Sequence, residues 1–173
     1  MAEEEKKQEW SKRTTQLVSL MALFLAVCAT FASLKSGGAN NTAILSQSQA
    51  SDMWAYYQAK SLKENTYRIQ VDSIKLTNPA PDSENAKLME KYKQKADRYE
   101  KEQKEIMQQA RDLESTRDAA IIKRTGFANS VTYLQIGIVL TSLGVLVKQL
   151  HFCYISAVIG GYGAIQFFMT LLG

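Results

Sequence analysis

Three long segments of the chain carry no charged side chain, and they constrain its fold more than any other feature. These segments are Leu17–Leu34, Gly126–Val147 and Phe152–Leu172. A helix crosses roughly 30 Å of hydrocarbon with about 20 apolar residues, because each residue rises by about 1.5 Å. Transmembrane β-strands alternate in polarity over about ten residues, whereas these segments are apolar on every face. The sequence therefore predicts three membrane-spanning helices and an all-α fold.

All 21 basic and 17 acidic side chains consequently lie outside the spans. Residues 35–125 hold too few clustered large apolar side chains for a globular core. An extended pair of helices needs only a seam, so we expect a long helical hairpin there. The predicted order is a charged N-terminal tail (1–16), transmembrane helix 1 (17–34), an extramembrane helical hairpin (35–125, turn at 78–83), transmembrane helix 2 (126–147), a tight turn (148–151) and transmembrane helix 3 (152–172).

Two interruptions are predicted within residues 35–125. Pro79 and Pro81 cannot occupy a helix interior, and each restricts the residue before it, so the hairpin turn is placed there. Asp82 or Ser83 then serves as the N-cap of the next helix. The segment Lys35–Thr42 contains a glycine pair and capping residues, and we expect one helix to end and another to begin within it.

The helix after the turn has a heptad pattern, in which the seam residues follow one another at alternating steps of three and four. On the helix before the turn, Leu62, Ile69 and Leu76 repeat every seven residues, and Val71 and Ile74 widen that stripe. The two stripes predict an antiparallel, coiled-coil-like pairing. The seam of the second helix comprises Met89, Tyr92, Ala96, Tyr99, Gln103, Ile106, Ala110, Leu113, Arg117 and Ala120.

Small residues recur at four-residue spacing in the predicted spans. Span three contains Ser156, Gly160 and Ala164, and span one contains Ala22 and Ala26. Such tracks let helix backbones approach closely in lipid, where packing rather than the hydrophobic effect drives association. They are candidates either for packing the three spans against one another or for an interface between copies of the chain.

No constellation of residues typical of an active site is visible, so we predict a non-enzymatic protein without a cofactor. Cys28 and Cys153 lie inside apolar segments, and His151 has no ligand-spaced partner, which argues against a metal site. Basic and acidic residues interleave along the predicted hairpin. Such a surface is solvated rather than a groove for nucleic acid, so no nucleic-acid partner is expected.

A channel is the alternative function. The spans contain the amide side chains of Gln135 and Gln166, which are candidate pore-lining residues under that alternative. Intramembrane glutamines more often form hydrogen bonds to a neighbouring helix. A small oligomeric channel or transporter component would require both glutamines to face one aqueous path.

The most conspicuous segment outside the spans is a cluster of aromatic and polar residues. Tyr and Trp bury large areas at low entropic cost, so the cluster is a candidate surface for another protein chain. Alternatively, Trp54 and Tyr57 pack on the second hairpin helix while Tyr56 stays exposed, or the rings lie at the level of the lipid headgroups. The candidate surface comprises Asp52, Trp54, Tyr56, Tyr57, Gln58 and Lys60.

The sequence resembles a family of bacterial membrane proteins known as domain of unknown function 4337. The resemblance covers almost the whole chain, and it implies the three-span architecture but no activity. The matching features are Gly38-Ala39-Asn40 after the first span, Ala50-Ser51-Asp52, the string Trp54-Ala55-Tyr56-Tyr57-Gln58-Ala59-Lys60, the charged helical hairpin, and the two terminal spans entered through Phe127–Gln135.

These observations predict a structural or interaction protein of the bacterial inner membrane. Its expected partners are the lipid bilayer, further copies of the chain in a homo-oligomer, and a protein docked on the hairpin. Lys and Arg in short loops favour the cytoplasmic side, whereas long loops translocate despite their charge. The basic residues of the tail and Lys148 therefore favour a cytoplasmic N-terminus and a periplasmic hairpin.

Overall fold

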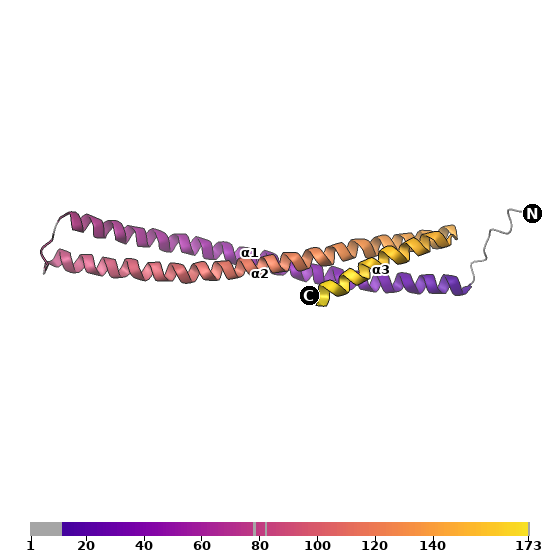
Figure 1. The fold of residues 1–173 in the computed structure, drawn as a ribbon. Coiled ribbons are helices and arrows are strands. Elements are labelled where there is room, and N and C mark those ends of the chain that lie inside the picture. Colours follow the sequence, from indigo (N-terminus) through magenta and orange to yellow (C-terminus); the bar gives the residue numbers. More distant parts are fainter. Residues whose placement is uncertain (1–11, 78, 82, 173) are drawn as a thin grey trace, which may run out of the picture. The chain divides into compact units, whose positions relative to one another are not determined.

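The described part of the chain forms three helices (Figure 1). The computed structural model describes residues 12–172 except 78 and 82. The helices are α1 (Lys12–Leu76), α2 (Glu84–Val147) and α3 (Leu150–Leu172), and no strand occurs in the described residues. The predicted all-α class is therefore confirmed. Most of the predicted N-terminal tail and the N-cap candidate Asp82 lie outside the described residues.

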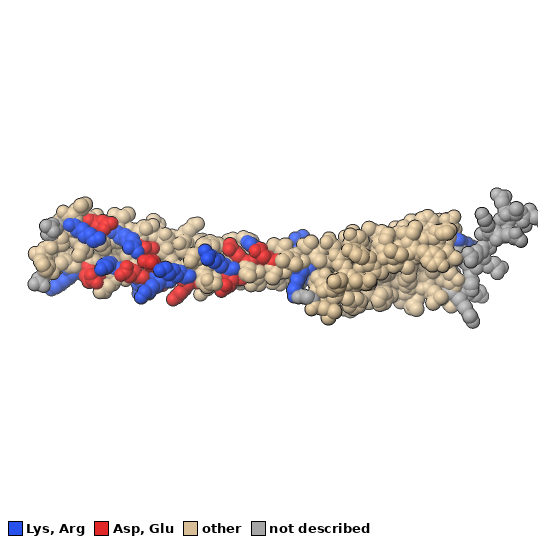
Figure 2. All heavy atoms as spheres, viewed as in Figure 1, with Lys and Arg blue, Asp and Glu red and all other residues tan. Residues whose placement is uncertain are grey.

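Each of the three helices contains a stretch long and apolar enough to cross a membrane. This agrees with the prediction of three spans. The chain divides into two compact units. We call Met1–Asn41 with Ala120–Gly173 the apolar unit, and Thr42–Ala119 the polar unit. In the face drawn in Figure 2, the charged side chains gather on the polar unit, while uncharged residues cover most of the apolar unit.

The predicted helix break at Lys35–Thr42 is wrong, because α1 continues through it. No glycine of the described chain has a positive φ, and a Cβ added to Gly37 or Gly38 would meet nothing within 4 Å. Glycine permits a left-handed turn but does not require one. Each helical glycine costs only about 1 kcal/mol relative to alanine, and the segment has no proline to remove a helix hydrogen bond.

The helices are interrupted around the two prolines, since α1 ends at Leu76 and α2 begins at Glu84, and Ser83 caps α2. The Ser83 Oγ accepts a hydrogen bond from the backbone N–H of Ala86 at 3.2 Å. That bond satisfies one of the N–H groups that the first turn of a helix leaves without an intrahelical partner. On the other side of the turn, α1 ends at Leu76, and the Thr77 Oγ1 donates to the carbonyl of Ile74 at 2.7 Å.

The connection between α2 and α3 is shorter than predicted. Only Lys148 and Gln149 lie between the helices, and His151 is already part of α3. Lys148 has a φ of 53°, which is the left-handed conformation that commonly ends a helix. The Gln149 N–H donates to the carbonyl of Gly144 at 3.2 Å. This bond, five residues back along the chain, is the one that closes a Schellman turn.

In the apolar unit, all three helices contribute to one core. Leu134 of α2 and Ala32 of α1 are fully buried, and Phe127 lies with its ring centroid 5.9 Å from that of Phe167 on α3. The outward residues of the same helices are large and apolar, such as Val158, which is 74% exposed. An apolar exterior of this kind is what a lipid-facing helix surface requires.

Candidate functional site

The polar unit contains the candidate surface predicted around Trp54, and the structure divides its residues between two faces of α1. Trp54, Tyr57 and Lys60 are partly buried, whereas Asp52, Tyr56 and Gln58 are exposed. The side chains of the first group are involved in contacts within the polar unit. Of the sequence alternative in which Trp54 and Tyr57 pack on the second helix while Tyr56 stays exposed, the structure shows the contact of Trp54 with α2 and the exposure of Tyr56.

Trp54 connects α1 to α2 through its indole. The Trp54 Nε1–H donates to the Glu114 Oε1 at 3.0 Å, and the Trp54 ring meets that of Tyr57 edge-on, with centroids 5.6 Å apart. Indole N–H groups usually find an acceptor when they are buried. This acceptor is a carboxylate, which makes the hydrogen bond charge-assisted and stronger than a neutral one.

Lys60 lies at the centre of a second contact between the helices. Its ammonium forms an ion pair with Glu102, which also accepts from the Arg98 Nε at 2.8 Å. The Lys60 side chain is only 13% exposed, and its Nζ lies 5.1 Å from the ring centroids of both Tyr56 and Tyr99. The hydrogen bonds from Lys60 and Arg98 lower the pKa of Glu102, and the bond to Glu102 raises the pKa of Lys60.

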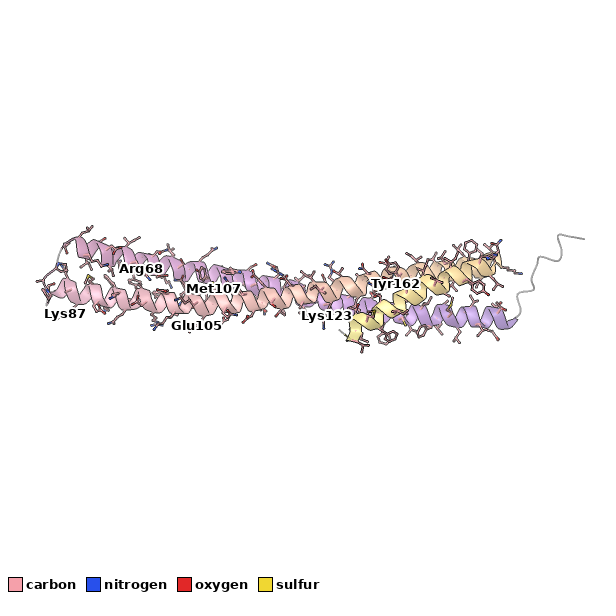
Figure 3. The ribbon with its side chains drawn as sticks, in the orientation of Figure 1. Arg68, Lys87, Glu105, Met107, Lys123 and Tyr162 are labelled. Atoms are coloured by element: carbon pink, nitrogen blue, oxygen red, sulfur yellow. The ribbon has the colours of Figure 1, made fainter. Side chains whose placement is uncertain are left out.

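Further from Trp54, the contacts between α1 and α2 remain polar. The Gln103 amide, which is 6% exposed, donates to Glu64, and Glu64 also accepts from the Arg68 Nε at 2.6 Å. Arg68 donates in addition to the Glu100 Oε2 at 2.9 Å. The hydrogen bond to Glu64 is the main cause that raises the pKa of the Arg68 guanidinium. Figure 3 marks Arg68 on α1.

Ten buried or half-buried residues of α1 in the polar unit form a stripe, which we call the inner stripe. Its members follow at alternating steps of three and four, as do the seam residues of α2, all of which are buried or half-buried. The seam predicted on α2 therefore coincides with its buried face. The inner stripe comprises Ala43, Ser46, Ala50, Met53, Tyr57, Lys60, Glu64, Tyr67, Val71 and Ile74.

The stripe predicted on α1 from its leucines and isoleucine is wrong. Leu62 is 69% exposed, Ile69 is 66% exposed and Leu76 is 89% exposed, so only Val71 and Ile74 of the predicted set belong to the inner stripe. The buried face of α1 is instead rich in aromatic and charged side chains. The aromatic and ionic contacts of this face with α2 determine which side of α1 is buried, whereas the prediction followed the aliphatic repeat on the other side.

The three exposed aliphatic residues belong to a second heptad pattern on α1, which we call the outer stripe. It also runs at alternating steps of three and four, every member is exposed, and none is charged. By contrast, the exposed side of α2 carries charges such as Lys87 and Glu105 (Figure 3). The outer stripe comprises Ala55, Ala59, Leu62, Thr66, Ile69, Ser73 and Leu76.

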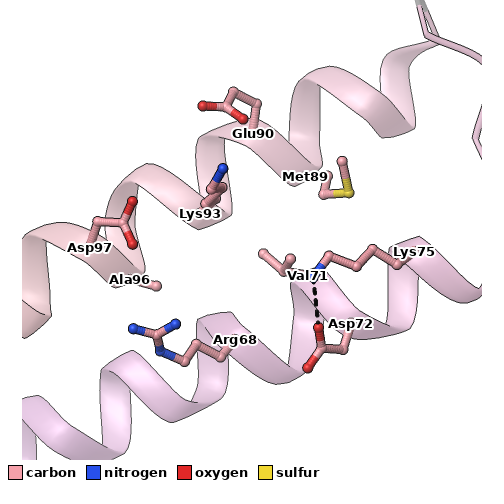
Figure 4. Close-up of a pocket in the computed structure, with 9 residues that line it drawn as sticks. All are labelled: Arg68, Val71, Asp72, Lys75, Met89, Glu90, Lys93, Ala96 and Asp97. Atoms are coloured by element: carbon pink, nitrogen blue, oxygen red, sulfur yellow. Dashed lines mark hydrogen bonds and ion pairs between the residues drawn. The ribbon is translucent and has the colours of Figure 1, made fainter.

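A groove of about 270 Å³ lies between α1 and α2 near the turn (Figure 4). Val71, Met89 and Ala96 supply its apolar lining. The charges around them are balanced, with three basic and three acidic side chains, so the groove presents no field of one sign to an anion or a cation. Its charged lining consists of Arg68, Asp72, Lys75, Glu90, Lys93 and Asp97.

In the apolar unit, the small residues of α3 are used within the chain. A Cβ added to Gly160 would lie 2.7 Å from the Leu25 Cδ1, and one added to Gly137 would lie 2.9 Å from the Gly160 Cα. Ser156 is fully buried, and Ala164 belongs to the core. The Ala22 and Ala26 positions of span one are only half-buried.

A hydroxyl cluster also joins α2 to α3 in the apolar unit. The Ser156 Oγ donates to the Gly137 carbonyl at 2.6 Å, and the Thr141 Oγ1 donates to the same carbonyl at 2.9 Å. The Thr141 and Ser156 hydroxyls are also within hydrogen-bond distance of each other. Both side chains are buried, and hydrogen bonds of this kind between helices support packing where no water is present.

The two glutamines predicted for a pore differ in their surroundings. Gln135 is exposed and lines a shallow groove of about 300 Å³ together with Ala29, Thr30, Ser33 and Leu34. Gln166 is half-buried, and its Oε1 is enclosed without a hydrogen-bond partner among the described residues. The groove at Gln135 does not include Gln166, so it does not unite them in one lining.

Within the described residues, no group of three or more His, Cys, Asp or Glu side chains could hold a metal ion. The molecule thus defines a class of protein by its helices: an all-α chain with three helices apolar enough to cross a membrane and a charged helical unit between the first two apolar stretches.

The chain belongs to the family described as a domain of unknown function (DUF4337), whose model matches residues 14–173. The match covers both units and all three helices. No curated protein and no solved structure matches the chain.

The exposed outer stripe is the part of the polar unit that sequence reasoning misassigned. Its heptad repeat of Leu62, Ile69 and Leu76 was visible, but it was interpreted as the seam between the two helices. The distribution of charged residues could have distinguished the buried stripe from the exposed one. Lys60 and Glu64 fall on the inner stripe, and Lys60 pairs with Glu102 on α2, whereas the outer stripe carries no charge.

Proposed function

We propose that the protein is a non-enzymatic interaction protein of the bacterial inner membrane, with three spans and a self-associating polar unit. In this proposal α1 and α2 of the polar unit form an antiparallel, coiled-coil-like hairpin on the periplasmic side. The contacts Trp54–Glu114 and Lys60–Glu102 support the pairing, because the residue number on α2 falls as that on α1 rises. The cytoplasmic N-terminus follows from the basic residues of the tail and Lys148.

The observation that carries the proposal is the outer stripe. An uncharged heptad pattern from Ala55 to Leu76 is exposed on a unit that is otherwise densely charged. Burying a leucine or isoleucine side chain fully contributes about 1.5–3 kcal/mol. Residues at heptad spacing fit as knobs into the holes of a neighbouring helix. The outer stripe is therefore suited to pack against a further helix.

The occupant that we propose is the same stripe of a second copy. Copies inserted into one bilayer share one orientation, so their α1 helices run in the same direction and can pair in register. Lys63 then faces Gln58 of the other copy, and Asp72 faces Thr77, which places no like charges opposite each other. Confinement to the membrane raises the effective concentration of the partners.

The exposed half of the aromatic cluster belongs to the same proposed surface. Asp52 continues the spacing of the outer stripe towards the N-terminus, and Tyr56 and Gln58 flank it. Tyr56 is 49% exposed. In an association between copies, this ring would cover the edge of the aliphatic contact, as aromatic residues do at protein interfaces.

The test is the double substitution of Leu62→Glu and Ile69→Glu in the full-length protein. Both side chains are exposed, so the helices should form as before, but four carboxylates would meet in each pair of copies. We expect the dissociation constant of the oligomer to rise roughly 100- to 1,000-fold, which corresponds to two lost aliphatic contacts. Molar mass by light scattering in mild detergent, over a range of concentrations, measures this change.

The matched control is Leu88→Glu, which makes the same chemical change at a partly exposed leucine of α2 in the same unit. Its oligomer should have the mass of the wild type. If the double variant kept the wild-type mass at every concentration, the outer stripe would have no part in association.

A further inference from the structure

The apolar unit exposes a carboxamide, that of Gln135, in a place where lipid is expected. Gln135 lies near the middle of the uncharged segment Gly126–Val147, and it is exposed. Asn129 is also exposed, but it lies close to the end of that segment, where the water of the headgroup region can reach it. The Gln135 carboxamide therefore has the greater need of a protein partner. This reasoning rests on the membrane insertion proposed above but not on the outer stripe.

No hydrogen-bond partner for the Gln135 amide occurs among the described residues, although Thr30 lines the same groove and Thr132 lies one turn before Gln135 on α2. The Thr30 Oγ1 donates to the carbonyl of Ala26 at 2.9 Å, and the Thr132 Oγ1 donates to that of Ala128 at 3.1 Å. Both hydroxyl protons are thus used within their own helices. Transfer of an unsatisfied amide from water to hydrocarbon is strongly unfavourable, so the bilayer favours any arrangement that supplies a partner.

A second copy of the chain supplies a complementary partner. A carboxamide carries two N–H donors and one carbonyl acceptor, so two such groups can satisfy each other reciprocally. Copies with the same orientation in the bilayer hold Gln135 at the same depth, which an unrelated helix would match only by chance. The neighbouring Ala29 and Ser33 are small, and small residues allow close approach between helices in lipid.

We propose that the Gln135 face of the apolar unit binds the same face of a second copy inside the bilayer, through reciprocal hydrogen bonds between the two Gln135 carboxamides. The helix α2 of each copy would contribute Gln135, and α1 would contribute the small residues beside it. This contact is separate from the outer stripe, because it involves different residues and a different environment. It gives the protein an intramembrane interface with a symmetric polar centre.

The experiment uses the full-length protein in native membranes with Gln135→Cys, followed by mild oxidation. Two cysteines at the proposed contact should form a disulfide-linked dimer. The native Cys28 and Cys153 are buried, so the wild type provides the background. Val158→Cys is the matched control, since that residue is 74% exposed on α3 of the same unit. Only Gln135→Cys should yield the linked dimer.

A second measurement tests the hydrogen bonds themselves. Energy transfer between labelled copies in liposomes gives the dissociation constant, and Gln135→Leu should raise it roughly 3- to 30-fold, the range that interhelical hydrogen bonds contribute in membranes. Gln135→Asn keeps the amide and should lose less. Equal association of the leucine variant and the wild type would overturn the inference.

Three further outcomes separate this inference from the function proposed above. A Gln135→Cys dimer that persists in the Leu62→Glu, Ile69→Glu background supports the intramembrane contact by itself. Linking at Val158→Cys but not at Gln135→Cys overturns it, while association that depends on the outer stripe would leave the proposed function standing. Labelling of Gln135→Cys by a membrane-impermeant maleimide in intact membranes would place the residue in water and also overturn the inference.

Discussion

The apolar unit and the polar unit hold their helices together in opposite ways. In the apolar unit, Gly137 and Gly160 let α2 and α3 approach closely, and the Ser156 hydroxyl crosses from one helix to the other. In the polar unit, α1 and α2 meet through larger side chains, such as Trp54 with Glu114 and Lys60 with Glu102.

The difference follows from the solvent expected around each unit. Between helices in lipid there is no hydrophobic driving force, so contact depends on the fit of small surfaces and on hydrogen bonds. In water, burial of apolar side chains stabilises a pair of helices in almost any register. Charged and aromatic pairs on the inner stripe penalise wrong registers, because a shifted helix would leave Lys60 or Glu64 buried without its partner.

The substitution with the largest expected effect fills the close contact between α2 and α3 in the apolar unit. We expect Gly137→Leu to lower the free energy of unfolding by about 3 kcal/mol, because its Cβ would lie 2.9 Å from the backbone of Gly160 and the helices would have to separate. Leucine is apolar, so insertion into the membrane should persist. Titration of sodium dodecyl sulfate into the protein in mild detergent, followed by circular dichroism, measures the loss.

Gly161→Leu is the control for that substitution. A Cβ at Gly161 would meet nothing within 4 Å, although this glycine adjoins Gly160 in α3. Leucine has a higher helix propensity than glycine by most of 1 kcal/mol. This variant should therefore unfold at the same detergent fraction as the wild type or slightly above it. Equal losses at both positions would mean that close approach does not hold α2 and α3 together.

The intermediate effect is expected in the polar unit for Trp54→Ala. The half-buried indole loses its packing against Tyr57 and its hydrogen bond to Glu114, and the free energy of unfolding should fall by about 2 kcal/mol. Trp54→Phe keeps a ring and loses only the hydrogen bond, which should cost about 1 kcal/mol. Hydrogen exchange of residues 42–119, followed by mass spectrometry, measures both changes in the unit concerned.

Gln58→Ala serves as the control, because that side chain is exposed and lies outside the inner stripe. Its removal should leave hydrogen exchange in the polar unit close to that of the wild type. A loss as large as that of Trp54→Ala would show that the exposed face of α1 stabilises the unit, contrary to the contacts described.

Much of the fold could be predicted because it depends on local patterns. Uncharged length predicted the three apolar helices, prolines located the turn before Ser83, and alternating spacing predicted the buried face of α2. The helix break predicted at Lys35–Thr42 was wrong because glycine weakens a helix without ending it. In α1 the aliphatic repeat was the stronger sequence signal, but the buried face is the more polar one.

The contacts at the candidate site could not be predicted for a different reason. Trp54 meets Glu114, and Lys60 meets Glu102, only in one register of α1 against α2. The sequence offers many acidic residues at helical spacing, and shifting the register by one heptad would offer others. The acidic residue that pairs with each side chain depends on how the whole inner stripe fits against α2. No single residue of the sequence shows that fit.

The smallest expected effect is a dependence of stability on pH, which we expect for the charged polar unit. The spans contain no Asp, Glu, Lys or Arg, whereas the folded polar unit lowers the pKa of Glu102 through hydrogen bonds from Lys60 and Arg98. A carboxylate with a lowered pKa contributes stability above its ordinary pKa of about 4.3, and this is lost as the pH falls through the lowered value. Lys60, whose pKa is raised, loses its contribution only above its ordinary value of about 10.4.

Glu102→Gln should therefore lower the thermal midpoint at neutral pH. The difference from the wild type should shrink as the pH falls below the ordinary glutamate pKa of about 4.3, and it should vanish only below the lowered pKa of Glu102, where the wild-type carboxyl is protonated as well. Circular dichroism melting curves of both proteins from pH 3 to pH 7 measure that difference. Glu105→Gln is the matched control, since Glu105 is exposed on the same helix and forms no ion pair within the described residues. A difference for Glu102→Gln that stayed constant across this range would mean that the charge of Glu102 contributes nothing to the stability of the polar unit.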